Sequence, residues 1–310
     1  MKAMPGALSI TVAIPTYRRE QVLLDTLDYL LALDSPPTEI LVLDQTEQHE
    51  PATEQRLDEM NDSGLIRWLR LATPSIPQAM NRGLLEAQHE IVLFVDDDIR
   101  PEPEFVAAHH AAHAQHDDVL VAGRVIQPWQ EGRDFSADEY FNFAGLKSFW
   151  IEEFIGCNFS VQRESALALG GFDENFVRVA YRFEAEFAYR WRASGRNIYF
   201  EPSACLHHLK DSGGGTRTYG EHLTTWRPDH AVGAYYYSLR TGKPGEFLQR
   251  PVRVVTTRHH LRRPWWIPLT LIAELRGMLW ALMLFVRGPR YVIPASKRPI
   301  TRSSEAPGHA

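Results

Sequence analysis

EIVLFVDDDIRP, at residues 90–101, joins an apolar run to three consecutive acids and so predicts both a buried strand and a candidate site. Side chains alternate along a strand, so Asp96 and Asp98 are expected on one side and Asp97 on the other. Two carboxylates at that spacing suit a Mg²⁺ or Mn²⁺ ion that also binds a diphosphate, because hard cations take oxygen ligands. Helix capping is the alternative, but it needs only one aspartate.

Three earlier apolar runs predict the rest of a parallel sheet: SITVAIP (9–15), EILVLD (39–44) and LIRWLRL (65–71). Helical patterns separate or follow the strands at about 18–33, 76–88 and 102–116. This alternation is typical of βαβ units, in which ligands bind beyond the carboxyl ends of the strands. The first candidate site residues are therefore Thr16, Asp44 and the three aspartates.

The second half of the chain is less regular. It predicts helices near 163–169 and 184–194 and a strand at 197–202. The segment KDSGGGTRTYG (210–220) is too rich in glycine to stay ordered without a ligand, so a mobile lid is expected there.

Three histidines share one face of the expected helix at 102–116, namely His109, His113 and His116. Their spacing would allow zinc binding, but no carboxylate stands where a His-Glu-x-x-His site has one. A polar helix face is therefore expected.

The composition indicates one sizeable α/β domain with an appendage, since 44% of the 310 residues are hydrophobic. Cys157 and Cys205 are expected as reduced thiols outside any metal cluster. The N-terminal segment shows no signal-peptide pattern, which favours the cytoplasm.

Charge is unevenly distributed along the chain. The net charge is −6, yet residues 250–298 hold ten Lys or Arg against Glu274 alone, while the other residues carry 23 basic and 38 acidic side chains. An acidic body argues against a nucleic-acid partner, and the basic segment indicates an anionic membrane surface.

The apolar stretch from about Trp265 to Val286 is almost long enough to span a bilayer. Glu274 and Arg276 near its middle would be costly in hydrocarbon, so an interfacial helix or re-entrant hairpin is predicted, with a buried core helix as the alternative. Trp265 and Trp266 would lie at headgroup level. The cations expected on anionic lipid are Arg258, Arg262, Arg263, Arg287 and Arg290. We therefore divide the chain into a catalytic domain, 1–245, and a membrane-associating tail, 246–310, peripheral to the inner face of the cell membrane.

Five motifs in order give the chain a family resemblance: TVAIPTYRR (11–19), LVLDQT (41–46), PQAMNRGL (77–84), VDDDIRP (95–101) and GCNFSVQRESALALGGFDE (156–174). Over about residues 9–208 the sequence resembles inverting family 2 glycosyltransferases. The resemblance implies an α/β GT-A nucleotide-diphospho-sugar transferase fold, a Rossmann-like mixed sheet with flanking helices. A C-terminal amphipathic helical tail would follow it.

The resemblance also assigns site residues. Asp98 would bind a divalent cofactor, Mn²⁺ or Mg²⁺, Asp96 would contact the ribose or the metal shell, and His208 would complete the metal site, with His207 as the alternative. The residues implied at the donor are Pro15, Thr16, Tyr17, Arg18, Asp44, Gln78, Asn81, Arg82, Asp96 and Asp97. Those implied on the acceptor side are Gly156, Cys157 and Asn158.

Asp44 has two readings. Accepting from a base N–H would favour uracil or thymine, and hence a UDP donor; capping the following turn is the alternative.

The segment RFEAEFAYRWRASG (182–195) is similar to the family's Glu-Asp-x-Asp/Glu helix, and Glu184 takes the position of the catalytic Asp. Phe183 replaces the acid that usually precedes it. A Glu can accept a proton from an acceptor hydroxyl, although its longer arm changes the reach. Glu186 is the competing base, and two solvated helix acids beside Arg190 and Arg192 are the alternative to both.

The predicted function is metal-dependent, inverting transfer of a sugar from a nucleotide diphosphate donor to a glycan or lipid-linked acceptor, in surface polysaccharide or glycolipid synthesis. A dinucleotide-binding oxidoreductase is excluded because no Gly-x-Gly-x-x-Gly follows the first strand. A nucleotidyltransferase would need a Gly-rich, basic phosphate loop that is also missing there. The remaining alternative is a degenerate nucleotide-sugar-binding or scaffold module.

Overall fold

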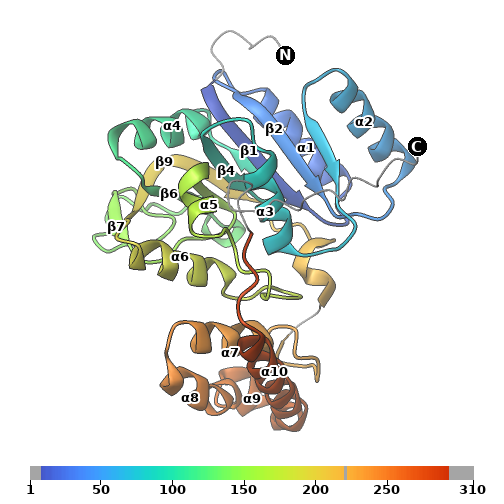
Figure 1. The fold of residues 1–310 in the computed structure, drawn as a ribbon, viewed down its shortest axis with the longest axis vertical. Helices are drawn as coiled ribbons and strands as arrows, with labels where there is room; N and C mark the ends of the chain where they lie inside the picture. The colour runs from blue at the N-terminus through green and yellow to red at the C-terminus, as the bar shows by residue number, and fades with distance from the viewer. Residues whose placement is uncertain (1–7, 220–221, 293–310) are drawn as a thin grey trace, which may run out of the picture.

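The computed structural model describes residues 8–219 and 222–292, which fold around a mixed nine-stranded sheet (Figure 1). The strand order is β3-β2-β1-β4-β8-β6-β9-β5, and β7 pairs with β9. The strands are β1 Leu8–Thr16, β2 Pro37–Asp44, β3 Arg67–Arg70, β4 Ile91–Val95, β5 Ile99–Pro101, β6 Leu120–Ile126, β7 Phe149–Ile151, β8 Asn158–Gln162 and β9 Ile198–His208.

The first four strands in this order are parallel, so their carboxyl ends meet at one edge of the sheet. Thr16 at the end of β1 lies opposite Asp44 at the end of β2. Strand β8 then pairs antiparallel with β4, which sets Asn158 opposite Val95. The start of β8 therefore lies beside the acids that follow β4.

Helices cover both faces of the sheet (Figure 1). One face buries aromatic and aliphatic side chains against α3, α5 and α6, with Phe94 and Phe159 at its centre. The other face packs on α1, α2 and α4 through residues such as Leu27 and Phe105. The helices are α1 Gln21–Leu31, α2 Pro51–Asp62, α3 Ile76–Glu86, α4 Phe105–Gln115, α5 Arg163–Ala168 and α6 Phe183–Ala193.

The last four helices form a cluster of their own below the sheet in Figure 1. They are α7 Ala231–Arg240, α8 Pro244–Val255, α9 Arg258–Arg262 and α10 Ile267–Arg287, with a short 3₁₀ turn at Pro264–Trp266 before α10. Helix α10 approaches α7 closely because Gly277 has no side chain: a Cβ there would lie 2.5 Å from the Cβ of Ala231. Helices from both sides of the predicted boundary at 245 pack together, and the boundary itself stays a prediction.

The predicted strands at 9–15, 39–44, 65–71 and 90–96 are confirmed, as are the helices at 76–88, 163–169 and 184–194. The predicted polar face of the helix at 102–116 is wrong. His109 and His113 are 0% and 8% exposed and bond to Ser160 on β8. Burial lowers the pKa of His109 to about 4 and that of His113 to about 3, so both are neutral packing residues.

Candidate active site

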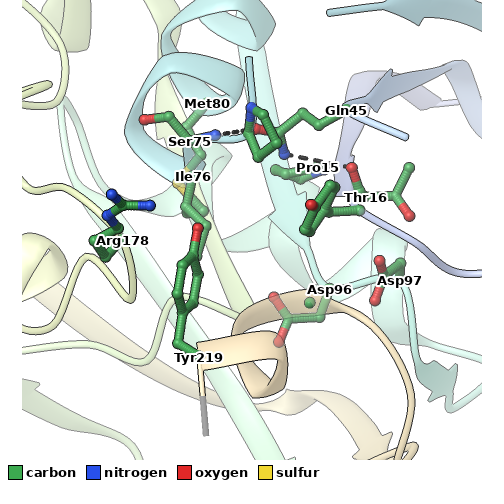
Figure 2. Close-up of a pocket in the computed structure, with 13 residues that line it drawn as sticks. Pro15, Thr16, Gln45, Ser75, Ile76, Met80, Asp96, Asp97, Arg178 and Tyr219 are labelled. Atoms are coloured by element: carbon green, nitrogen blue, oxygen red, sulfur yellow. Dashed lines mark hydrogen bonds between the residues drawn. The ribbon is translucent and has the colours of Figure 1, made fainter. Parts of the chain in front are cut away.

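Two adjoining cavities lie at the carboxyl ends of the parallel strands. The first, which we name the strand-end cavity, has a volume of about 120 Å³ (Figure 2). Its lining residues are Pro15, Thr16, Tyr17, Gln45, Pro74, Ser75, Ile76, Met80, Asp96, Asp97, Arg178, Gly215 and Tyr219. The second, the Glu184 cavity, has a volume of about 430 Å³ and shares Ile76, Met80 and Asp96 with the first. Asp96 therefore faces both.

The acids after β4 are held by one buried arginine. Arg19 is 6% exposed, and its guanidinium lies 3.1 Å from Asp97 Oδ1 and 3.4 Å from Asp98 Oδ2. The same guanidinium donates to Asp211 and to the carbonyl of Gly213, in the glycine-rich segment after β9. Arg19 thus ties the acids to the predicted lid.

A candidate metal site is formed where β4 and β9 end. His208 Nε2 lies 3.5 Å from Asp96 Oδ2 and 3.2 Å from Asp98 Oδ1. Its buried Nδ1 has no hydrogen-bond partner within residues 8–219 and 222–292. Two carboxylates and an imidazole form a donor set that Mn²⁺ accepts, so the residues present fit the predicted cofactor.

Cys157 lies closer to this group than its sequence context indicated. Its Sγ and ligand atoms of Asp96 and His208 all lie within 4.8 Å of one another, so the expectation that it stands apart from any metal cluster was wrong. Burial and the charges of Asp96 and Asp98 raise the pKa of the Cys157 thiol well above its usual range. Mn²⁺ and Mg²⁺ prefer carboxylate oxygen to sulfur, so Asp96, Asp98 and His208 define the site for these ions.

His207 faces the other side of β9. Its ring bonds to Glu131 at 2.6 Å and to Glu102 at 2.7 Å, away from the acids after β4. Neighbouring strand residues point to opposite faces, and here that alternation selects His208.

The pKa values of Asp97 and Asp98 shift in opposite directions. Burial by itself would raise the pKa of Asp98, but hydrogen bonding and charge from His208, together with Arg19, outweigh it and lower the pKa. Burial raises the pKa of Asp97 to about 7 despite Arg19. Asp98 is therefore the carboxylate most firmly ionised beside His208.

Glu184 stands in the first turn of α6 and lines the second cavity. Burial there, and then the negative charge of Asp96, raise its pKa to about 7. Gly156 leaves room for its carboxylate, since a Cβ at that position would lie 3.1 Å from Glu184 Oε1. A carboxyl with this pKa can accept a proton near neutral pH.

Glu186, the competing base, has a different environment. It is 1% exposed, and its carboxylate receives a bidentate ion pair from Arg190 at 2.8 and 2.9 Å. It is not among the described residues that line the Glu184 cavity. The geometry favours Glu184 as the base.

Asp44 already has several partners. It accepts hydrogen bonds from His49 at 2.7 Å, Trp68 at 2.9 Å and the backbone N–H of Thr46 at 2.8 Å. Burial would raise its pKa, but the bonds from His49 and Thr46 lower it. Gln45, the next residue, lines the strand-end cavity instead and bonds to the Thr16 carbonyl and the Ser75 N–H (Figure 2).

The remaining predicted residues divide between the site and its support. Pro15, Thr16 and Tyr17 line the strand-end cavity, and Gly156 and Cys157 line the Glu184 cavity. Arg18 lies at a neighbouring groove, and Gln78 and Arg82 line a separate hollow beside Glu174.

Asn81 and Asn158 are buried, and their side chains bond to backbone groups of neighbouring segments. Asn81 is 2% exposed and bonds to the backbone of Phe172, while Asn158 is 0% exposed and joins β8 to the carbonyls of Arg124 and Ala204. Their predicted donor and acceptor contacts remain predictions.

Sequence reasoning missed several residues of the two cavities: Arg19, Gln45, Arg178, Lys210 and Tyr219. Arg178 stands in a loop whose backbone is left-handed at Arg178, Ala180 and Arg182. No local pattern signals that conformation in non-glycine residues. Arg19 is the last residue of the opening motif TVAIPTYRR, and Lys210 and Tyr219 lie in the predicted lid segment, so those places in the sequence were the available signals.

A mixed sheet with an acid cluster and two cavities at its strand ends is the arrangement of a GT-A glycosyltransferase. The model of the family "Glycosyl transferase family 2" matches residues 11–170, and the chain belongs to that family. It is thus a glycosyltransferase enzyme, as the motifs predicted.

One characterised relative is the glucosyl-dolichyl phosphate glucuronosyltransferase of Haloferax volcanii. It is 22% identical over 218 residues, which cover 65% of this chain and 69% of the relative.

Solved structures share the fold at low identity. The Staphylococcus aureus TarS fragment 1–349 with UDP-GlcNAc has a TM-score of 0.58 at 14% identity. The alignment covers 91% of this chain and 92% of the TarS fragment. The Pyrobaculum calidifontis mannosyltransferase PcManGT with GDP-Man and Mn²⁺ has a TM-score of 0.53 at 21% identity, covering 90% and 79%. GalNAc-T7 with UDP, GalNAc and Mn²⁺ has a TM-score of 0.55 at 14% identity and covers 76% of this chain, which spans only 51% of GalNAc-T7.

Proposed function

We propose that this enzyme uses a divalent metal to transfer a sugar, with inversion, from a nucleotide diphosphate donor to an acceptor hydroxyl. The observation that carries the proposal is the convergence of Asp96, Asp98 and His208 beside the cavity that contains Glu184. Acid ligands for a diphosphate-bound metal and a separate base are the two requirements of a single displacement.

The strand-end cavity is the proposed nucleotide site. Gln45 lies in its wall with its amide bonded to the Thr16 carbonyl and the Ser75 N–H, and Arg178 is the lining side chain that carries a positive charge.

Three structural neighbours were solved with UDP, UDP-GlcNAc or GDP-Man, which supports a nucleoside diphosphate in the strand-end cavity. We propose UDP as the donor nucleotide because two of these neighbours hold UDP or UDP-GlcNAc. The Asp44 contact on which the sequence prediction of UDP rested is not needed for this proposal, since His49 and Trp68 bond to that carboxylate.

Asp96, Asp98 and His208 would hold Mn²⁺ or Mg²⁺. Bound there, the ion supplies positive charge beside the donor diphosphate. Arg178 adds a second positive charge from the opposite wall of the cavity (Figure 2). The lid segment contributes Gly215 and Tyr219, which cover the cavity and would exclude water from the bound donor.

Glu184 is the proposed general base. The acceptor hydroxyl loses its proton to the Glu184 carboxylate and attacks the anomeric carbon, while the bond from that carbon to the diphosphate breaks. Because one displacement occurs, the anomeric configuration inverts.

We further propose a glycan or lipid-linked acceptor and a peripheral position on the cytoplasmic face of the membrane, in surface polysaccharide or glycolipid synthesis. The helix Pro264–Arg287 is long and apolar enough to cross a membrane by length and composition. One of its faces packs on α7, and the opposite face is exposed, with Leu275 53% and Val286 84% accessible. That arrangement supports an interfacial helix.

The donor is identified by nucleotide diphosphate release from a panel of sugar nucleotides, with Mn²⁺, Mg²⁺ or EDTA, in the presence of lipid acceptors. Release from one donor, abolished by EDTA, is the expected result. Metal-dependent binding of UDP without release from any donor would instead identify a non-catalytic binding module.

A further inference from the structure

A third hollow lies outside the lid, between the catalytic cavities and α10. We name it the α10 groove; its volume is about 920 Å³. It shares Tyr17, Pro74, Arg178 and Tyr219 with the strand-end cavity. A ligand in the groove would therefore contact the same residues that enclose the nucleotide site.

Four arginines line the groove: Arg18, Arg178, Arg227 and Arg276. Asp229 is the carboxylate among the lining residues, and it lies 3.8 Å from Arg178. The groove wall therefore carries a clear excess of positive charge. All four arginines are exposed to solvent.

The opposite wall is apolar and belongs to α10. Arg276, Leu279, Trp280 and Met283 all line the groove, and their spacing places them on one face of the helix. Leu279 and Met283 are 57% and 49% exposed. The guanidinium of Arg276 lies over the ring of Trp226, 4.4 Å from its centroid, so the charge sits at the boundary of the apolar wall.

We propose that the α10 groove binds the phosphate headgroup of an anionic membrane lipid, with the lipid chains lying along the exposed face of α10. The inference rests on the proposed membrane association and adds a defined site to it. Arginine guanidinium groups match phosphate oxygens, and exposed leucine, methionine and tryptophan match hydrocarbon. A soluble phosphate would contact only the arginines of the groove and would leave the apolar wall formed by α10 exposed to water.

The position of the groove links the membrane to the catalytic site. Arg178 and Tyr219 line both hollows, so a lipid headgroup would fix the lid end and the arginine that face the donor. The enzyme would thereby be oriented with its cavities next to the bilayer surface.

The test is co-sedimentation with vesicles of phosphatidylcholine alone or with phosphatidylglycerol, without donor or metal. The variants are Arg276→Gln and Arg227→Gln. The matched control is Arg56→Gln, which removes one exposed arginine of α2 that is not among the groove residues. We expect each groove variant to lose about fivefold or more in affinity for anionic vesicles, and the control to lose less than twofold.

Equal losses from all three variants would overturn the groove while leaving membrane association intact. Absence of vesicle binding by the unaltered protein would contradict both proposals. Inorganic phosphate is added to the same assay as a soluble competitor. If low millimolar phosphate released the protein from vesicles, the proposal that the ligand is a lipid would be contradicted. Unchanged thermal melting confirms that each variant is folded.

Discussion

Charged residues are usually exposed and apolar residues buried, but the acid cluster after β4 and the exposed face of α10 depart from this pattern in opposite ways. At the site, charged groups are buried: Arg19 and Asp97 are each 6% exposed and Asp98 is 1% exposed. On α10, apolar groups are exposed, up to 84% for Val286. Buried charge costs several kcal/mol per ion unless it is paired, and exposed apolar surface forgoes about 25 cal/mol per Å².

This difference suggests a separate place for each proposed activity: sugar transfer at the acids after β4, and membrane contact on α10. The buried acids are stabilised within the protein, because Arg19 lies beside Asp97 and Asp98 and His208 lies beside Asp98. The apolar face of α10 is not covered by the described residues, and this is the observation for which we propose a lipid partner. The strand-end cavity and the α10 groove share Arg178 and Tyr219, so we expect changes away from that shared wall to affect one region without the other.

The largest effect is expected for Asp98→Ala. Removing this carboxylate leaves Asp96 and His208 as an incomplete donor set, and turnover should fall about 10³-fold. Nucleotide diphosphate release measures it, and Asp62→Ala, at the exposed end of α2, is the control. Vesicle binding should not change; a loss of both activities would contradict the separation of the two regions.

The double change Leu275→Asp with Val286→Asp reverses the polarity of the exposed face of α10. Affinity for anionic vesicles should fall at least tenfold, because each side chain gives up about 1.5 kcal/mol or more of apolar burial. Leu65→Asp, on a leucine that is 41% exposed and remote from α10, is the control. Turnover of a soluble acceptor analogue should be retained, and vesicle affinity equal to that of the control would refute the apolar contact.

Activity should depend on pH through Glu184. Since a base acts when deprotonated, and burial raises the pKa of Glu184 to about 7, turnover should rise with pH and level off above about 7. Below that pKa the rate should fall about tenfold per pH unit. A kcat profile from pH 5.5 to 8.5 at saturating Mg²⁺ checks this, and a flat profile would argue against Glu184.

The smallest effect concerns the joint between α7 and α10. A Cβ at Gly277 would lie 2.5 Å from the Cβ of Ala231, so Gly277→Ala should lower the free energy of unfolding by about 1–2 kcal/mol. The matched control is Gly245→Ala, because no atom lies within 4 Å of a Cβ there. Urea unfolding compares the two, and equal stability would show that the helices do not meet closely at Gly277.

Much of the fold was predictable because its strands are local apolar runs. SITVAIP and EIVLFVD each carry enough hydrophobic residues to mark a buried strand without knowledge of its neighbours. Strand β8 was missed because it spans only Asn158–Gln162 and includes Asn158 and Ser160, whose polar side chains bond to buried histidines. Its strand character depends on the contacts with β4 and β6.

The site was predictable where one motif supplies the chemistry and harder where distant segments meet. Asp96 and Asp98 were identified from three adjacent letters, and the structure places His208 beside them. Arg178 lies in a loop and Tyr219 ends the short 3₁₀ helix Gly215–Tyr219; the two residues are 41 positions apart and meet only in the folded chain (Figure 2). For Asp44 the motif was a poorer guide. It assigned this carboxylate to the nucleotide base, but in the structure the carboxylate bonds to His49 and Trp68.

The most direct test of the account compares Glu184→Gln with Glu186→Gln by single-turnover nucleotide diphosphate release, with UDP binding and thermal melting measured on the same samples. Glu184→Gln should bind UDP normally and lose about 10²- to 10⁴-fold in rate. Glu186→Gln should melt earlier, because Arg190 loses a charged partner, and yet retain most of its rate. The reverse pattern, with Glu184→Gln active and a folded, UDP-binding Glu186→Gln inactive, would contradict the assignment of the base.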